Sequence, residues 1–84
     1  MVLPSQPVTL TVEQVSDLNR QLSNMRHDIN NHLSLILAAV DLIRRKPQIT
    51  DRMMATLSEQ PPKINDAILT FSREFEAKFG ILRQ

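Results

Sequence analysis

Residues 15–43 read VSDLNRQLSNMRHDINNHLSLILAAVDLI, and this stretch decides the fold. Apolar or core-compatible residues recur in it at alternating intervals of three and four, the spacing of a helix that packs lengthwise against another helix. These positions, here called the packing seam, are Val15, Leu18, Leu22, Met25, Ile29, His32, Ile36, Ala39 and Ile43. The pattern predicts one long helix.

Signals for both ends of this helix flank the seam. Thr11 is followed three residues later by Gln14, which fits a capping box at a helix start. Residues 44–46 are Arg, Arg and Lys, cations that suit the negative end of the helix dipole, and Pro47 cannot continue the hydrogen-bond ladder. We therefore expect a helix from residue 11 to about residue 46. Residues 1–10, which contain two prolines, are expected to form a lead-in or linker.

A second periodic segment follows a short turn at residues 47–50. Its apolar positions are Leu57, Ile64, Ile68, Phe71, Phe75 and Phe79. Gly80 suits the position just after a helix, whereas Pro61 and Pro62 should kink or break the segment because each removes an amide donor. With 42% apolar residues and one glycine in 84, the expected fold is all-α: an antiparallel two-helix hairpin over residues 11–80 with a tail at 81–84.

The apolar surface of the first helix is wider than one partner helix would cover. It extends beyond the seam to Leu33, Leu35, Leu37, Val40 and Leu42. A chain of this size buries only about 60% of its unfolded surface. We expect two hairpins to form a homodimeric four-helix bundle, the alternative being a monomer bound to another helical protein.

Composition excludes several classes of function. There is no cysteine, so disulfides, thiolate metal sites and thiol catalysis are absent. The net charge is only +1 and no aromatic residues accompany the cations at 44–46, which argues against nucleic acid. No apolar run reaches the roughly 20 residues of a membrane span. We expect a cytoplasmic protein whose chain makes no membrane contact.

The polar cluster MRHDINNHL, residues 25–33, interrupts the apolar pattern. Counted from the seam positions, His27 lies on the opposite, water-facing side of the helix, whereas His32 lies on the seam itself. We expect His32 to be a core or interfacial residue with a hydrogen-bond partner, and we expect His27 to be exposed. Spacing alone would leave His27 an ordinary surface residue.

The neighbours of His27 change this interpretation. His27, Asp28 and Asn31 read HD-x-x-N before an apolar run, which resembles the phosphoacceptor box of the dimerisation and histidine-phosphotransfer domain of sensor histidine kinases. The resemblance covers the chain from about Val12 to Phe79. One departure is that the family usually has a proline directly after the box, where this chain has His32.

The resemblance implies a role for each box residue. His27 would accept the phosphoryl group of ATP through its outer ring nitrogen, and Asp28 would accept a hydrogen bond from the other ring nitrogen. Asn31 would position water for dephosphorylation of a response regulator. The receiver domain of that regulator would dock just past the histidine, on Ser34, Leu35, Ala38 and Leu42. Alternatively, Leu35 and Leu42 belong to the dimer core.

The chain lacks the parts of a complete kinase. With one glycine it has no Gly-rich phosphate loop, so ATP and Mg²⁺ would be bound by a separate catalytic domain and the hairpin would not be active alone. Two alternatives remain. One, from a different class of function, is a purely structural dimerisation hairpin without phosphotransfer, and the other is a close relative, a standalone histidine phosphotransfer protein. A metal site on Asp28 and His32, spaced i, i+4, is a weak alternative because two ligands make a poor site.

Overall fold

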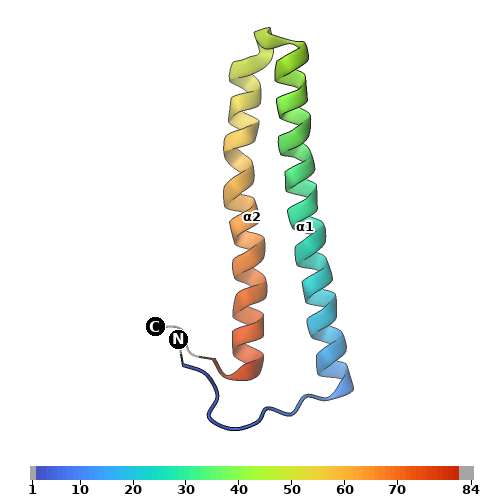
Figure 1. Ribbon diagram of the computed structural model, residues 1–84, viewed down its shortest axis with the longest axis vertical. Coiled ribbons are helices and arrows are strands. Elements are labelled where there is room, and N and C mark those ends of the chain that lie inside the picture. The colour runs from blue at the N-terminus through green and yellow to red at the C-terminus, as the bar shows by residue number, and fades with distance from the viewer. Residues whose placement is uncertain (1, 82–84) are drawn as a thin grey trace.

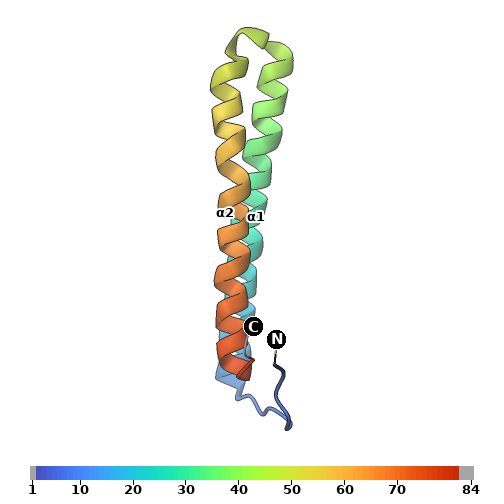
Figure 2. The same cartoon turned by 90° about the vertical axis from the view of Figure 1, so that its left-hand side faces the viewer.

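The computed structural model of the chain describes residues 2–81 (Figure 1). Helix α1 spans Val12–Arg45, a 3-10 turn η1 spans Pro47–Ile49, and helix α2 spans Thr50–Phe79. The helices run antiparallel and side by side, so the lead-in and the last described residues lie at the end opposite the turn (Figures 1 and 2). The predicted all-α hairpin is confirmed. Residue 1 of the lead-in and residues 82–84 of the predicted tail lie outside the described residues.

The start of α1 is the capping box expected from the sequence. The Thr11 Oγ1 accepts the Gln14 amide at 3.1 Å, and the Gln14 Oε1 accepts the Thr11 amide at 2.8 Å. Two amides that have no partner within the helix are thereby satisfied. At the other end, Lys46 leaves helical geometry with φ −135° and ψ 78°, because a residue before proline is pushed out of the α region.

The turn and the end of α2 follow local chemistry. Pro47 occupies the first position of η1, and the Thr50 hydroxyl donates to the Pro47 carbonyl at 2.6 Å, which ties η1 to the start of α2. Gly80 ends α2 with φ 64°, and the Ile81 amide donates to the Glu76 carbonyl at 2.9 Å. This bond belongs to a Schellman motif, whose left-handed residue is usually glycine. The predicted role of Gly80 is confirmed.

Of the kink or break expected at Pro61 and Pro62, the break is absent. Helix α2 continues through both prolines from Thr50 to Phe79. The two prolines deprive only the carbonyls of Leu57 and Ser58 of their usual amide donors. The rest of the ladder, together with packing against α1 on both sides of the prolines, is sufficient to keep the helix in one piece.

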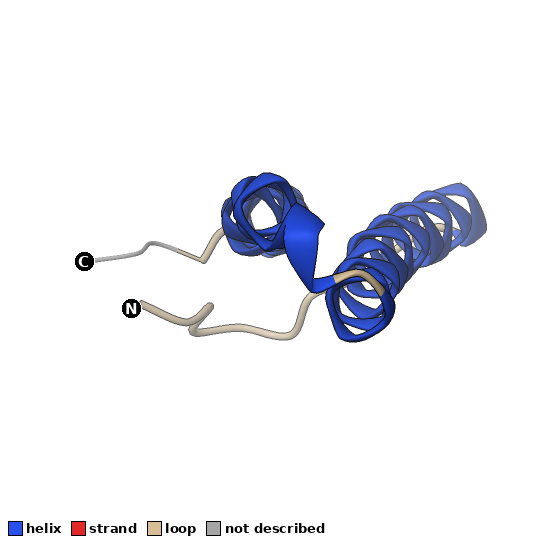
Figure 3. Cartoon of the chain, turned by 90° about the horizontal axis from the view of Figure 1, so that it is seen from above, coloured by secondary structure: helices blue, strands red, loops and turns tan. Residues whose placement is uncertain are grey.

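The hairpin is a single layer without an enclosed core. Its extents are 58 × 29 × 12 Å, and the shortest equals about one helix diameter with side chains (Figure 3). Among the described residues only Ala39 and Gln60 are buried, each 2% exposed. The other seam positions of α1 are half-buried, apart from Val15, which is exposed. Both broad faces of the hairpin are therefore open.

Charged residues join the two helices near the open end. Asp17 on α1 pairs with Arg20 one turn on, and the Lys78 Nζ of α2 lies 3.1 Å from the Asp17 Oδ2. The Gln21 Nε2 also donates to this Oδ2, at 3.2 Å. The hydrogen bonds from Arg20 and Lys78 lower the pKa of the Asp17 carboxyl below its usual value. Lys78 thus links the last turns of α2 to α1.

Candidate functional site

His27 projects from the middle of α1 on the side opposite the packing seam. At about 100° of rotation per residue, it lies half a turn around the helix from Ile36, a central seam position. Its side chain is 79% exposed. An imidazole exposed to this degree is accessible to a large partner.

Asp28 lies beside the ring of His27. Its Oδ1 is 3.9 Å from the His27 Nδ1, and its side chain is 60% exposed. This distance exceeds that of a hydrogen bond, so the two groups are neighbours rather than bonded partners in this structure. The carboxylate lies on the Nδ1 side of the ring, which leaves Nε2 as the nitrogen for a reaction partner.

The other predicted site residues share one side of α1. Asn31 is exposed one turn after His27, and the four predicted docking residues are exposed further along. They are Ser34, Leu35, Ala38 and Leu42. Rotation along the helix places Leu35 and Leu42 on the flank that also bears Asp28, whereas Leu33 and Leu37 lie on the other flank. The exposed leucines of α1 therefore fall into two groups on opposite faces of the hairpin.

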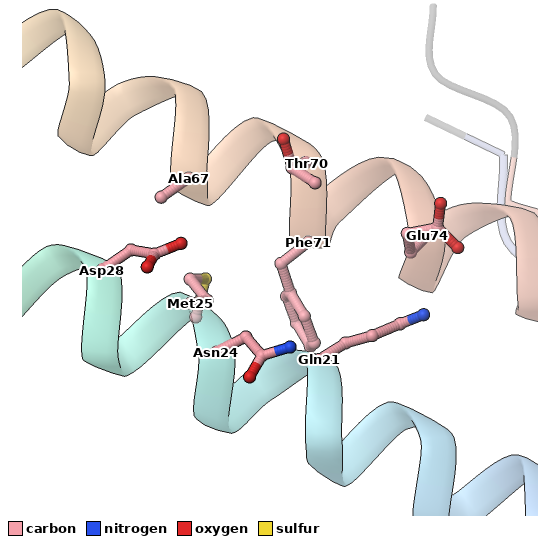
Figure 4. Close-up of a pocket in the computed structure, with 8 residues that line it drawn as sticks. All are labelled: Gln21, Asn24, Met25, Asp28, Ala67, Thr70, Phe71 and Glu74. Atoms are coloured by element: carbon pink, nitrogen blue, oxygen red, sulfur yellow. The ribbon is translucent and has the colours of Figure 1, made fainter.

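A groove of about 160 Å³ lies between the helices on the face that bears Asp28. It is lined by Gln21, Asn24, Met25, Asp28, Ala67, Thr70, Phe71 and Glu74. The Phe71 ring reaches from α2 toward α1 and forms an apolar floor with Met25, and the carboxylates of Asp28 and Glu74 lie at the rim (Figure 4). The groove is below the roughly 300–1,000 Å³ of small-molecule sites, so it has room for a side chain rather than a nucleotide.

The second histidine occupies a different environment. The His32 Nδ1 lies 2.8 Å from the Gln60 Oε1, across the seam between α1 and α2. The Gln60 Nε2 donates to the Thr56 carbonyl at 3.1 Å, and a carbonyl only accepts, so the amide oxygen must face His32. His32 therefore carries its proton on Nδ1 and donates it. The expectation of a seam histidine with a hydrogen-bond partner is confirmed.

Gln60 and Lys78 were not identified from the sequence. Gln60 falls three residues after Leu57 and four before Ile64, so the seam spacing of α2 was the signal that could have found it. A polar residue at that position breaks the apolar pattern, so apolar periodicity alone does not mark it as a seam residue. Lys78 carried no comparable signal, because its partner Asp17 lies 61 positions earlier and the pairing depends on the register of the hairpin.

Comparison of the chain with protein-family models, with curated proteins and with solved structures finds no match. Across residues 2–81, no three side chains of histidine, cysteine, aspartate or glutamate gather where they could share a metal ion. In the same range, neither helix combines the length and the apolar character needed to cross a membrane. The site must therefore be interpreted from its own geometry.

Proposed function

We propose that this hairpin is the dimerisation and phosphoacceptor domain of a two-component histidine kinase. The observation that carries the proposal is the exposed ring of His27, which projects from the middle of α1 on the side away from the packing seam, with the Asp28 carboxylate beside its Nδ1. A phosphoryl carrier must be reached in turn by a kinase and by a response regulator, and this placement allows access to both. The compartment of such a protein is the cytoplasm, where ATP is available.

The chemistry follows from the ring of His27. A neutral imidazole is a nucleophile near pH 7, and its Nε2 lone pair would form the bond to the γ-phosphorus of ATP as the bond to the bridging oxygen breaks and ADP leaves with the electron pair. Asp28, on the Nδ1 side, would stabilise the positive charge that develops on the ring. A separate catalytic domain would bind ATP and Mg²⁺, which supply the charge neutralisation that phosphoryl transfer requires.

The phosphoryl group would then pass to an aspartate of a receiver domain. Leu35 and Leu42 support this step, because they are exposed on the flank of α1 that bears Asp28, and Asn31 lies between that flank and His27. A regulator seated there would contact apolar side chains while its aspartate reached His27. Asn31 would orient the water that later removes the phosphoryl group from the regulator.

The surface area of the chain supports a homodimeric four-helix bundle. A compact monomer of 9.6 kDa is expected to expose about 5,100 Å². This chain exposes 6492 Å², an excess of about 1,400 Å². Two chains that covered this excess would bury about 2,800 Å² together, which lies within the roughly 2,000–5,000 Å² of permanent homodimers.

One face of the hairpin suits this interface. The exposed apolar residues on it include five that are here called the apolar flank: Leu33, Leu37, Met54, Ile68 and Phe75. In a pair of antiparallel helices, a residue displaced from the seam in a given rotational sense lies on the same face of the pair, whichever helix it belongs to. These residues of α1 and α2 therefore share one face. The groove with Asp28, together with Leu35 and Leu42, lies on the opposite face. Dimerisation through the apolar flank would leave the site accessible.

The test is incorporation of labelled phosphate from ATP when histidine kinase catalytic domains are supplied in trans. We expect acid-labile, base-stable label on the wild-type chain and on Asn30→Gln, a control at an exposed position within the box. His27→Gln should take up no label. Asp28→Asn should be labelled more slowly, because the charge beside Nδ1 is lost. Absence of label on a folded wild-type dimer would favour a purely structural hairpin.

A further inference from the structure

The hydrogen bond between His32 and Gln60 is a polar contact within an otherwise apolar stretch of the seam, and it lies close to the site. Gln60 is 2% exposed, and its amide oxygen lies 2.8 Å from the His32 Nδ1. In antiparallel helices, the contact of His32 with Gln60 sets the levels on either side, which puts Ile29 level with Ile64 and Ile36 level with Leu57. One polar layer thus interrupts a run of apolar layers.

Such a layer contributes specificity rather than strength. Replacing both members of a buried polar pair by apolar groups is often neutral or stabilising, whereas removing one leaves the other without a partner. Aliphatic layers at alternating intervals of three and four would permit a shift of one helix along the other. A shift would place the imidazole of His32 and the amide of Gln60 against aliphatic side chains. The pair therefore selects one register.

The turn of α2 that bears Gln60 also lacks backbone hydrogen bonds that the rest of the helix can form. Pro61 and Pro62 follow directly, and the carbonyls of Leu57 and Ser58 receive no amide from them. The Gln60 Nε2 donates to the Thr56 carbonyl just before this gap, so the same side chain ties its own turn together and links it to α1.

We propose that the His32–Gln60 hydrogen bond is a positioning contact that sets the register and rotation of the HDINN box, residues 27–31, against the proline-containing turn of α2. His32 follows the box directly, within one continuous helix. Whatever holds the ring of His32 against Gln60 also determines the direction in which His27 projects. A change at the proline-containing turn would reach His27 through this contact. The inference rests on the proposed function for its effect on phosphoryl transfer, but its effect on register does not depend on that function.

The first arm of the test measures register without any phosphoryl transfer. The chain has no cysteine, so cysteines introduced at the exposed positions Asn30 and Arg73 carry the only two spin labels. Labelled chains are mixed with excess unlabelled chain, so that only distances within one hairpin are measured. We expect one narrow distance distribution in the otherwise wild-type chain, and a broadened or shifted distribution when His32→Leu and Gln60→Leu are combined. An unchanged distribution in that double variant would overturn the proposal.

The second arm measures the rate of label uptake from ATP, with a catalytic domain in trans. The double variant should fold at least as well as the wild type, yet take up label at least tenfold more slowly. The matched control combines Ile36→Leu with Leu57→Ile, which alters an adjacent apolar layer and should leave the rate unchanged. A double variant that is labelled at the wild-type rate would overturn the proposal. If the wild type takes up no label, the proposed function fails, and the distance measurement alone decides whether the pair sets the register.

Discussion

Substitution of Leu37 by glutamine should weaken the proposed homodimer strongly. Leu37 is 70% exposed in the single hairpin and lies on the apolar flank. Full burial of a leucine side chain contributes about 1.5–3 kcal/mol, so covering the exposed part contributes about 1–2 kcal/mol per chain. Two copies meet in a two-fold dimer, which gives about 2–4 kcal/mol. At 1.4 kcal/mol for each factor of ten, the dissociation constant should rise roughly 30- to 700-fold.

Sedimentation equilibrium over a range of concentrations measures this constant directly. Glutamine is a good helix former, so Leu37→Gln should leave the helical content unchanged by circular dichroism. The matched control is Leu35→Gln, two residues away and 47% exposed on the opposite face, which should leave the dimer intact. The interface would be misplaced if Leu35→Gln dissociated the dimer and Leu37→Gln did not. Equal effects of both variants would refute the division of α1 into two flanks.

Three further predictions concern stability, each measured by thermal or denaturant unfolding at fixed protein concentration. Gln60→Leu should lower the free energy of unfolding by about 1–3 kcal/mol, since His32 loses its partner, and adding His32→Leu should restore it. Pro62→Ala should raise the free energy of unfolding by about 2 kcal/mol, because the helix regains an amide donor; a decrease would mean that the proline is needed for packing. The pKa of Asp17 is lower in the folded state, so its ionised carboxylate should stabilise the fold. This stabilisation should be complete above the pKa of an unfolded aspartate, about 4, and should be lost as the pH falls through the lower folded pKa. Asp17→Asn should reduce this acid dependence, and an unchanged pH profile would show that the ion pairs at the open end do not contribute.

The architecture of the hairpin could be predicted because its signals are local. The capping box at Thr11 and Gln14, the stop before Pro47 and the left-handed Gly80 each depend on a few neighbouring residues, and all three are found in the structure. Whether Pro61 and Pro62 break α2 could not be predicted from the sequence, because the effect of a proline depends on the packing around it. The loss of two backbone hydrogen bonds did not outweigh the contacts that the same helix makes with α1.

The candidate site was predictable only in part, because some of its contacts join residues that are far apart in the sequence. The exposure of His27 and the partnered position of His32 follow from helical rotation relative to the seam. The partner itself, Gln60, and the ion pair of Lys78 with Asp17 depend on how far α2 returns along α1, which the turn sets and local sequence does not reveal. Leu35 and Leu37, in contrast, lie on opposite flanks because of helical rotation alone, although the apolar composition of α1 suggests one wide stripe.

The most direct test of the account is the location of the phosphoryl group on the chain. After incubation with ATP and a histidine kinase catalytic domain, the intact chain is digested under alkaline conditions, and its peptides are fragmented in a mass spectrometer. A phosphoryl group is expected on the exposed His27 ring and none on His32, whose half-buried ring lies on the seam against Gln60. A phosphoryl group on His32, or on a serine or threonine hydroxyl instead of His27, would contradict it.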